Sequence, residues 1–348
     1  MLRKGLLLKH SFHKKTGSRL LSVAIIILIL SASITVRFLF ADILSFNRFS
    51  ELYCRQLLSQ DTLSLHYALA DPGARGIHCE SVTLGSFPSA DDRTARAALE
   101  NESALLSSFY DSHLSAEQEL ILHIMNWQNA LEKKLQDGCV FSEQLSSSLG
   151  IQAQLPVLLA EYEFRCREDI DTYFLLLEDT DRYLREYLSW QQEKVDRGII
   201  PATKTLDSLI DQCREFLGEE SREHFLQTVF VSRCRDCDFL SEKELASLAD
   251  RHFSLLTDHV FAAYHTLISG FQAMQDTAGT LAGLCTYPGG RDYYEAYVQY
   301  ACGTDLSLEE IRLRLYTQLI SDIKAVRRLN LSALNDVSLY EQDRKSVV

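Results

Sequence analysis

The chain has 348 residues, of which 46% are hydrophobic and only five are proline, so it can bury a large core in one or two domains. Its 48 acidic residues outnumber its 35 basic residues, which gives a net charge of −13. An acidic surface repels a phosphate backbone, so we expect no nucleic-acid partner. Runs rich in Leu, Ala, Glu and Gln favour helices over sheet.

The N-terminus has the pattern of a membrane anchor. The first nineteen residues carry six basic side chains and no acidic one. The apolar run from Leu20 to Ala41, interrupted only by Arg37, would span about 33 Å as a helix, enough to cross a hydrocarbon core of about 30 Å. Because basic flanks stay in the cytoplasm, residues 1–19 are predicted to be a cytoplasmic tail and residues 20–41 a signal anchor. The cell membrane is then the expected location, with the lipid bilayer as partner and the body outside the cytoplasm.

Two other interpretations of this segment stay open. Ser31-Ala32-Ser33 has the small side chains of a signal-peptidase site, although the apolar run continues past it. A buried core helix is the other alternative, but core helices seldom follow so many unopposed basic residues. After residue 41, 28 basic residues stand against 48 acidic ones, so the body carries a net charge of −20.

Residues 42–330 are predicted to form an all-α, multi-helix domain. Three capping boxes of the form Ser-x-x-Glu/Gln predict helix starts, at Ser115 with Gln118, Ser241 with Glu244, and Ser307 with Glu310. Apolar residues also recur at helical spacing, which predicts three core-facing stripes. These stripes are Leu120, His123, Ile124, Trp127 and Leu131; Ile170, Tyr173, Phe174 and Leu177; and Leu245, Leu248, Ala249, His252, Leu256, His259, Val260, Ala263 and Leu267.

The histidines and cysteines do not make a complete catalytic or metal-binding pattern. None of the ten histidines lies in a His-Glu-x-x-His motif. His252 and His259 are interpreted as core or boundary residues, and His224 as a surface residue. Cys234-Arg-Asp-Cys237 lacks the second ligand pair of a structural zinc site, and the nine cysteines have no framework spacing. We therefore predict no catalytic residue and no metal ligand in this chain.

The segment from Gly283 to Tyr294 is the most unusual stretch. Pro288-Gly289-Gly290 predicts a turn that leads into a helix opening with Tyr293 and Tyr294. Adjacent helical residues point about 100° apart, so one tyrosine is expected to pack while the other faces a cleft. These five residues are the candidate substrate-binding residues, with simple packing as the alternative.

This segment and Gly303–Glu310 resemble the bacterial family known as domain of unknown function 885. Three upstream stretches are similar to the same family, so the resemblance covers roughly residues 45–330. The resemblance implies an all-helical fold that is often exported or membrane-anchored, is related to zinc-dependent peptidases, and has the Pro-Gly-Gly segment near its cleft. The upstream stretches are Leu63–Tyr67 with Thr83–Gly85, Leu149–Tyr162, and Asp169–Gly198.

What the resemblance implies about catalysis does not transfer to this chain. In such peptidases His-Glu-x-x-His and a downstream glutamate, in the C-terminal half, hold the zinc that activates water. No position here matches them, so zinc and peptide substrates are expected only in a full-length version.

The C-terminus predicts an incomplete protein. Asp343–Val348 reads like the translation of a common sequencing adapter, so we expect residues 331–348 to be a tail and the natural protein to continue after about Gln342. Our first interpretation is the catalytically incompetent N-terminal portion of a membrane-anchored, extracytoplasmic zinc-metallopeptidase-like protein. The alternative is a complete, non-catalytic helical binding module at the cell surface.

Overall fold

The computed structural model describes residues 41–88, 92–142, 145–280 and 283–328. The chain divides into two compact units, residues 1–283 (unit 1) and residues 284–348 (unit 2). Within the described ranges every regular element is helical, and the only strand-like pairing is a single bridge between Ala202 and Gly279. The predicted all-α fold class is therefore confirmed.

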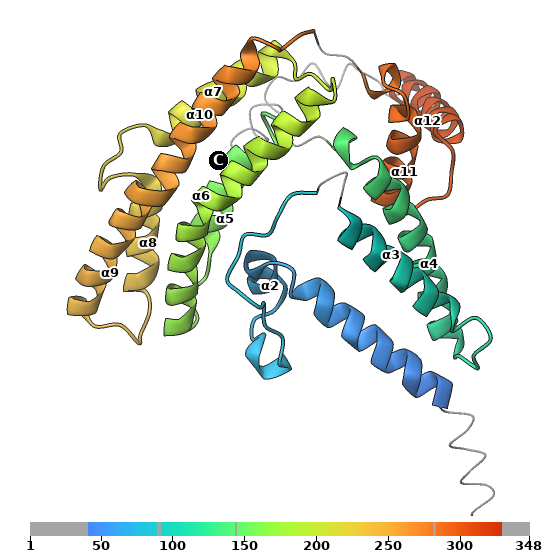
Figure 1. Cartoon of the computed structure of the whole chain (residues 1–348), viewed down its shortest axis with the longest axis horizontal. Helices are drawn as coiled ribbons and strands as arrows, with labels where there is room; N and C mark the ends of the chain where they lie inside the picture. The colour runs from blue at the N-terminus through green and yellow to red at the C-terminus, as the bar shows by residue number, and fades with distance from the viewer. Residues whose placement is uncertain (1–40, 89–91, 143–144, 281–282, 329–348) are drawn as a thin grey trace, which may run out of the picture. The chain divides into compact units, whose positions relative to one another are not determined.

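The described residues of unit 1 form a helix over residues 41–58 followed by nine α-helices (Figure 1). The long helix α6 provides the largest share of the core. In chain order the α-helices are α2 (Thr62–Ala68), α3 (Arg93–Ser107), α4 (Ala116–Asp137), α5 (Ile151–Glu161), α6 (Arg167–Asp196), α7 (Thr203–Leu217), α8 (Phe225–Arg235), α9 (Glu242–Leu255) and α10 (Ala262–Gln275). Short 3₁₀ turns cover Gly73–Arg75 and Cys139–Phe141, and a π-helical turn, Leu256–Phe261, joins α9 to α10.

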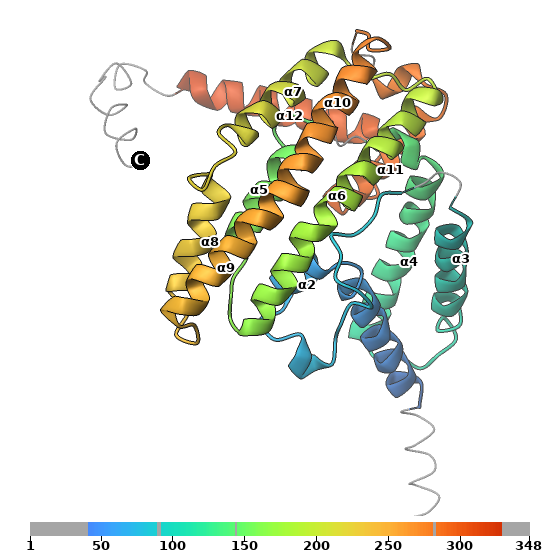
Figure 2. The same ribbon diagram turned by 60° about the vertical axis from the view of Figure 1, so that its left-hand side comes forward.

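The main hydrophobic core is formed mostly by side chains of helices α5 to α10, and α6 and α7 run along α10 (Figures 1 and 2). The predicted stripe of α6 faces this core, because Ile170, Tyr173, Phe174 and Leu177 are all at most 1% exposed. The 3.6-residue period placed these side chains on one side of the helix, and their burial removes most of their apolar surface from water. This stripe prediction is confirmed.

A second, smaller core joins the helix over residues 41–58 to α3 and α4. Its buried members are Phe46, Leu106, Phe109, Leu122 and Met125. The predicted stripe of α4 is confirmed only in part, since Leu131 is buried but Leu120 is 60% exposed and Leu122 is buried instead. The helix carries apolar residues on two sides, and the position of its neighbours decides which side is covered.

The long stripe after Ser241 is confirmed as core-facing. The buried side chains run along α9, the π turn and α10 and include His252, Leu256, Val260 and Leu267. The π turn between the two helices adds a residue to one helical turn, so His259 is only half-buried. Side-chain oxygens of Ser and Glu or Gln form reciprocal bonds at all three predicted capping boxes, which confirms those helix starts.

Unit 2 consists, within its described residues, of a 3₁₀ turn (Leu284–Thr286), α11 (Gly290–Cys302) and α12 (Leu308–Arg328). Across the described part of both units, no helix combines the length and the apolar character that crossing a bilayer requires. Residues 20–40, which contain nearly all of the predicted anchor, lie outside the described residues, as do 329–348. The anchor and the tail therefore stay predictions.

Candidate functional site

The Pro-Gly-Gly turn contains two glycines, and each position requires glycine for a different structural reason. Gly289 has a φ of 79°, in the left-handed region that favours glycine, and forms the N-cap of α11. Gly290 donates its amide to the carbonyl of Tyr287 at 3.0 Å. A Cβ atom on Gly290 would overlap the backbone carbonyl of Leu284, so the close approach of the 3₁₀ turn requires glycine here. The predicted turn into a helix is confirmed.

The two adjacent tyrosines separate as the helical geometry predicts. Tyr293 is buried and its ring stacks on that of Tyr297, with centroids 6.3 Å apart and planes 12° apart. Tyr294 is 47% exposed. Tyr293 therefore has a packing role within unit 2, and Tyr294 is the accessible member of the pair. Contact of Pro288, the glycines or either tyrosine with a substrate stays a prediction.

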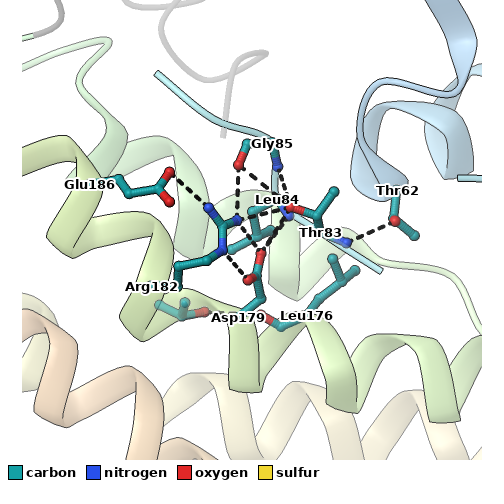
Figure 3. Close-up of polar contacts among 9 residues, drawn as sticks. Thr62, Thr83, Leu84, Gly85, Leu176, Asp179, Arg182 and Glu186 are labelled. Carbon is teal, nitrogen blue, oxygen red and sulfur yellow. Dashed lines mark hydrogen bonds and ion pairs between the residues drawn. The ribbon is translucent and has the colours of Figure 1, made fainter. Parts of the chain in front are cut away.

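Unit 1 brings two of the family-like stretches together around Asp179 and Arg182 of α6 (Figure 3). Arg182 donates two hydrogen bonds to the Asp179 carboxylate, from Nε at 2.7 Å and from Nη2 at 2.8 Å. The same carboxylate accepts the amide of Leu84 at 2.8 Å and the hydroxyl of Thr83 at 3.3 Å. Arg182 Nη2 also donates to the carbonyl of Gly85 at 2.9 Å.

These contacts attach the extended segment Thr83–Gly85 to the middle of α6. The segment's other side is held by α2, since Thr62 and Thr83 exchange two hydrogen bonds at 2.9 and 3.0 Å. The hydrogen bonds to Asp179 raise the pKa of Arg182 above its ordinary value. Every polar group that Asp179 and Arg182 present at this junction has a partner, so the arrangement is suited to fixing a loop.

A second junction joins the remaining stretches at His66 of α2. Its ring stacks on Tyr162 with centroids 3.7 Å apart, and its Nδ1 lies 3.8 Å from the Asp169 carboxylate. The Arg165 guanidinium donates to three carbonyls at the end of α2, including that of His66. Burial lowers the pKa of His66, so its neutral form is favoured. The neighbouring Tyr67 donates its hydroxyl to the Leu158 carbonyl at 2.7 Å.

The family-like stretches thus converge in space, although they are far apart in the sequence. The family model described as "Bacterial protein of unknown function (DUF885)" matches residues 74–325. The chain belongs to the DUF885 family. Its fold is similar to the crystal structure of "the putative lipoprotein from Colwellia psychrerythraea", with a TM-score of 0.65 at 15% identity.

That likeness covers 82% of this chain and 51% of the solved chain, so the DUF885 chain described here spans about half the length of its structural relative. At this identity the likeness shows the fold alone. A search of the curated proteins found no match.

Besides His66, the DUF885 chain buries two more histidines in unit 1. His252 is fully buried, stacks face to face on Phe230 at 4.0 Å, and pairs its Nδ1 with Gln227 Oε1 at 2.5 Å. Burial lowers the pKa of His252 to about 3, so the ring is neutral at physiological pH. The prediction of a core histidine is confirmed for His252.

His224 corrects the sequence interpretation, which placed it at the surface. It is the N-cap of α8 and is 7% exposed. Its Nδ1 accepts the amide of Leu226 at 3.3 Å, and its Nε2 lies 2.8 Å from the carbonyl of Phe216. The ring is buried because it caps the start of α8 while it contacts the Phe216 carbonyl of α7. The spacing of histidines and cysteines along the sequence does not indicate this contact.

The arrangement of the thiols bears on the zinc that the DUF885 resemblance implies. Cys234 and Cys237 are free, as are the other seven cysteines. Burial raises the pKa of Cys234 to about 12, and Cys237 donates its thiol to the Arg233 carbonyl at 3.3 Å. Among the described residues no three His, Cys, Asp or Glu side chains gather in a way that could hold a metal ion. The described residues therefore do not fit a zinc site.

The sequence did not single out the residues that connect the family-like stretches. These residues lie in or beside segments that resemble the family, but their local spacing does not distinguish them from solvated helix charges. They are Arg165, Asp169, Asp179 and Arg182. The one available signal was the i,i+3 spacing of Asp179 and Arg182, which allows an ion pair on one helix face.

Proposed function

We propose that this chain is the N-terminal, non-catalytic part of a larger extracytoplasmic DUF885 protein that residues 20–41 anchor in the cell membrane. The observation that carries the proposal is the coverage, since the chain spans about half of a solved relative while the family model matches most of the chain. The name of that relative, a lipoprotein, supports a location outside the cytoplasm. The basic tail and the apolar run of the sequence support the anchor.

The structure supports a scaffolding role for these residues. The two junctions bind loops and helix ends with paired charges, and their polar atoms are directed into the fold. Where the larger protein hydrolyses peptides with zinc, we propose that the metal ligands come from residues outside this chain. The candidate contribution of this chain to substrate contact is the exposed Tyr294 beside the Pro-Gly-Gly turn.

Topology is tested by labelling thiols in spheroplasts with a maleimide that does not cross membranes. Cys54 and Cys302 are exposed in the structure and are expected to react in the intact chain. A Ser11→Cys variant, which adds a thiol to the predicted cytoplasmic tail, is the matched control and is expected to react only after lysis. Protection of Cys54 and Cys302 together with labelling at position 11 would overturn the proposed orientation.

The metal assignment is tested separately on the full chain purified in mild detergent. After dialysis against a buffer with trace zinc, we expect no stoichiometric zinc by metal analysis and no cleavage of peptide substrates. One tightly held zinc ion per chain, together with peptide cleavage that a chelator abolishes, would refute the proposal.

A second candidate function is a self-sufficient binding module at the cell surface. The exposed tyrosines Tyr294 and Tyr297 of α11 favour it, because tyrosine is enriched among the residues that dominate protein interfaces. A self-sufficient module should unfold in one sharp transition, whereas part of a larger fold should expose apolar surface and melt broadly.

A further inference from the structure

Helix α12 is amphipathic but its apolar side is not covered within unit 2. Five apolar residues fall within an arc of about 100° when the helix is viewed along its axis. We name them the α12 stripe; they are Leu315, Tyr316, Leu319, Ile323 and Val326, and they are 39–65% exposed. None of the 21 residues of α12 is buried.

Unit 2 cannot stabilise this helix with its own described residues. Among residues 284–328 the buried ones are Gly290, Tyr293 and Ala296, all in α11. A segment of this size buries too little apolar surface to hold two helices together, and a helix gains most of its stability from packing its apolar face. The rest of the buried apolar residues belong to unit 1. The described residues of unit 2 therefore leave the α12 stripe uncovered.

The length of the solved relative points to an occupant for the α12 stripe. The fold of that relative extends well beyond the part shared with this chain, which accounts for 51% of its length. Where a chain spans about half of a fold, an apolar helix face that its own unit leaves uncovered is expected to pack against elements of the other half. A contiguous apolar stripe is also the surface that an amphipathic helix recognises, by interlocking its own apolar side chains with those of its neighbour.

We propose that the α12 stripe is the surface on which the remaining helical half of the DUF885 protein packs. The inference rests on the proposed function in one respect, namely that the chain is part of a larger product. The occupant is a segment of the same polypeptide with an apolar helical face. Unit 1, a second copy of this chain and a lipid surface are the competing occupants, and the experiment separates them from the remaining half, since coverage by unit 1 would give equal rates in the two proteins.

The test compares the reactivity of one introduced thiol in two proteins. Leu319→Cys is made in the 348-residue chain and in the product of the intact gene, and modification by a soluble maleimide is followed at that position by peptide mass spectrometry. The matched control is Leu120→Cys in α4, since Leu120 and Leu319 are both leucines on helices and are 60% and 54% exposed. Both positions accept a small side chain without disturbing a buried core.

We expect the Leu319→Cys variant to react at least about tenfold more slowly in the intact gene product than in the 348-residue chain, because a packed thiol reacts only when the helix opens. The Leu120→Cys variant should react at the same rate in both. Equal rates for the Leu319→Cys variant in the two proteins would overturn the inference while leaving the proposed function standing.

Three further outcomes would also overturn it. Protection of the Leu319→Cys variant that rises with the concentration of the 348-residue chain would identify a second copy as the occupant. Protection by vesicles of anionic phospholipid would identify a membrane surface. A native stop codon after residue 348 would remove both the occupant and the proposed larger protein, and sequencing the locus distinguishes that case from a failure of the packing surface alone.

Discussion

Replacing Asp179 with alanine should loosen the junction that holds Thr83–Gly85 against α6. The carboxylate is only 13% exposed and accepts the amide of Leu84 together with two donors of Arg182. The substitution leaves the Leu84 amide without its acceptor and leaves the Arg182 guanidinium without the partner that orients it. Leu84 is itself part of the main core, so loosening the segment also disturbs packing.

The expected loss follows from the hydrogen bonds. A hydrogen bond to a charged group contributes about 1.5–3 kcal/mol, and a buried donor left without a partner costs a similar amount. Because Arg182 is partly exposed and keeps its contacts with Glu186 and Gly85, the losses do not add fully. We expect the free energy of unfolding to fall by about 2–4 kcal/mol.

The control is Asp181→Ala, two residues along the same helix. Asp181 pairs with Arg185 at 2.9 Å, but Arg185 is 66% exposed and this ion pair holds no loop. Surface pairs of this kind contribute about 0–1 kcal/mol. Both substitutions replace aspartate with alanine inside α6, so the gain in helix propensity is the same and cancels in the comparison.

The measurement is urea unfolding of the full chain in mild detergent, followed by the helical circular dichroism signal. For Asp179→Ala we expect the midpoint to fall by about 1 M with an unchanged slope, and for Asp181→Ala by a much smaller amount. If the two variants lost the same stability, the carboxylate of Asp179 would not be holding the loop, and the structural role assigned to this junction would be wrong.

Three other variants test buried and strained positions. Burial lowers the folded-state pKa of His252 to about 3, so its neutral ring contributes fully to the free energy of unfolding above the unfolded pKa of about 6.5. This contribution is lost as pH falls from about 6.5 towards 3, by about 1.4 kcal/mol per pH unit. In pH-dependent unfolding, His252→Phe should therefore flatten this part of the curve, and an unchanged slope would contradict the assignment. Gly290→Ala should disrupt the start of α11, since its Cβ would overlap the Leu284 carbonyl. Gly303→Ala has open space around it and a φ of 61°, so it should cost only about 1 kcal/mol. Limited proteolysis next to α11 checks this pair, and greater cleavage of the Gly303→Ala chain would refute the ranking.

The features that the sequence predicted correctly depend on residues close together along the chain. The box at Ser241 and Glu244 joins residues three apart, and helix geometry alone brings them within bonding distance. The stripe through Phe174 follows the helical period and forms the apolar side of α6, so only one orientation of this helix buries it. The turn at Gly289 and Gly290 is likewise local, since Gly289 has a left-handed φ that favours glycine and Gly290 lies against the carbonyl of Leu284, a few residues earlier.

The features that only the tertiary structure decided depend on partners far apart in the sequence. Helix α4 has two apolar sides, and it buries Leu122 and not Leu120 because the helix over residues 41–58 and α3 lie on that side. His224 is buried because α7 supplies the carbonyl that its ring meets. Asp179 reaches the Leu84 amide across 95 positions, a pairing that no local pattern encodes. Short-range hydrogen bonds and helical periodicity are properties of a segment, whereas burial and long-range polar contacts exist only once the helices have packed.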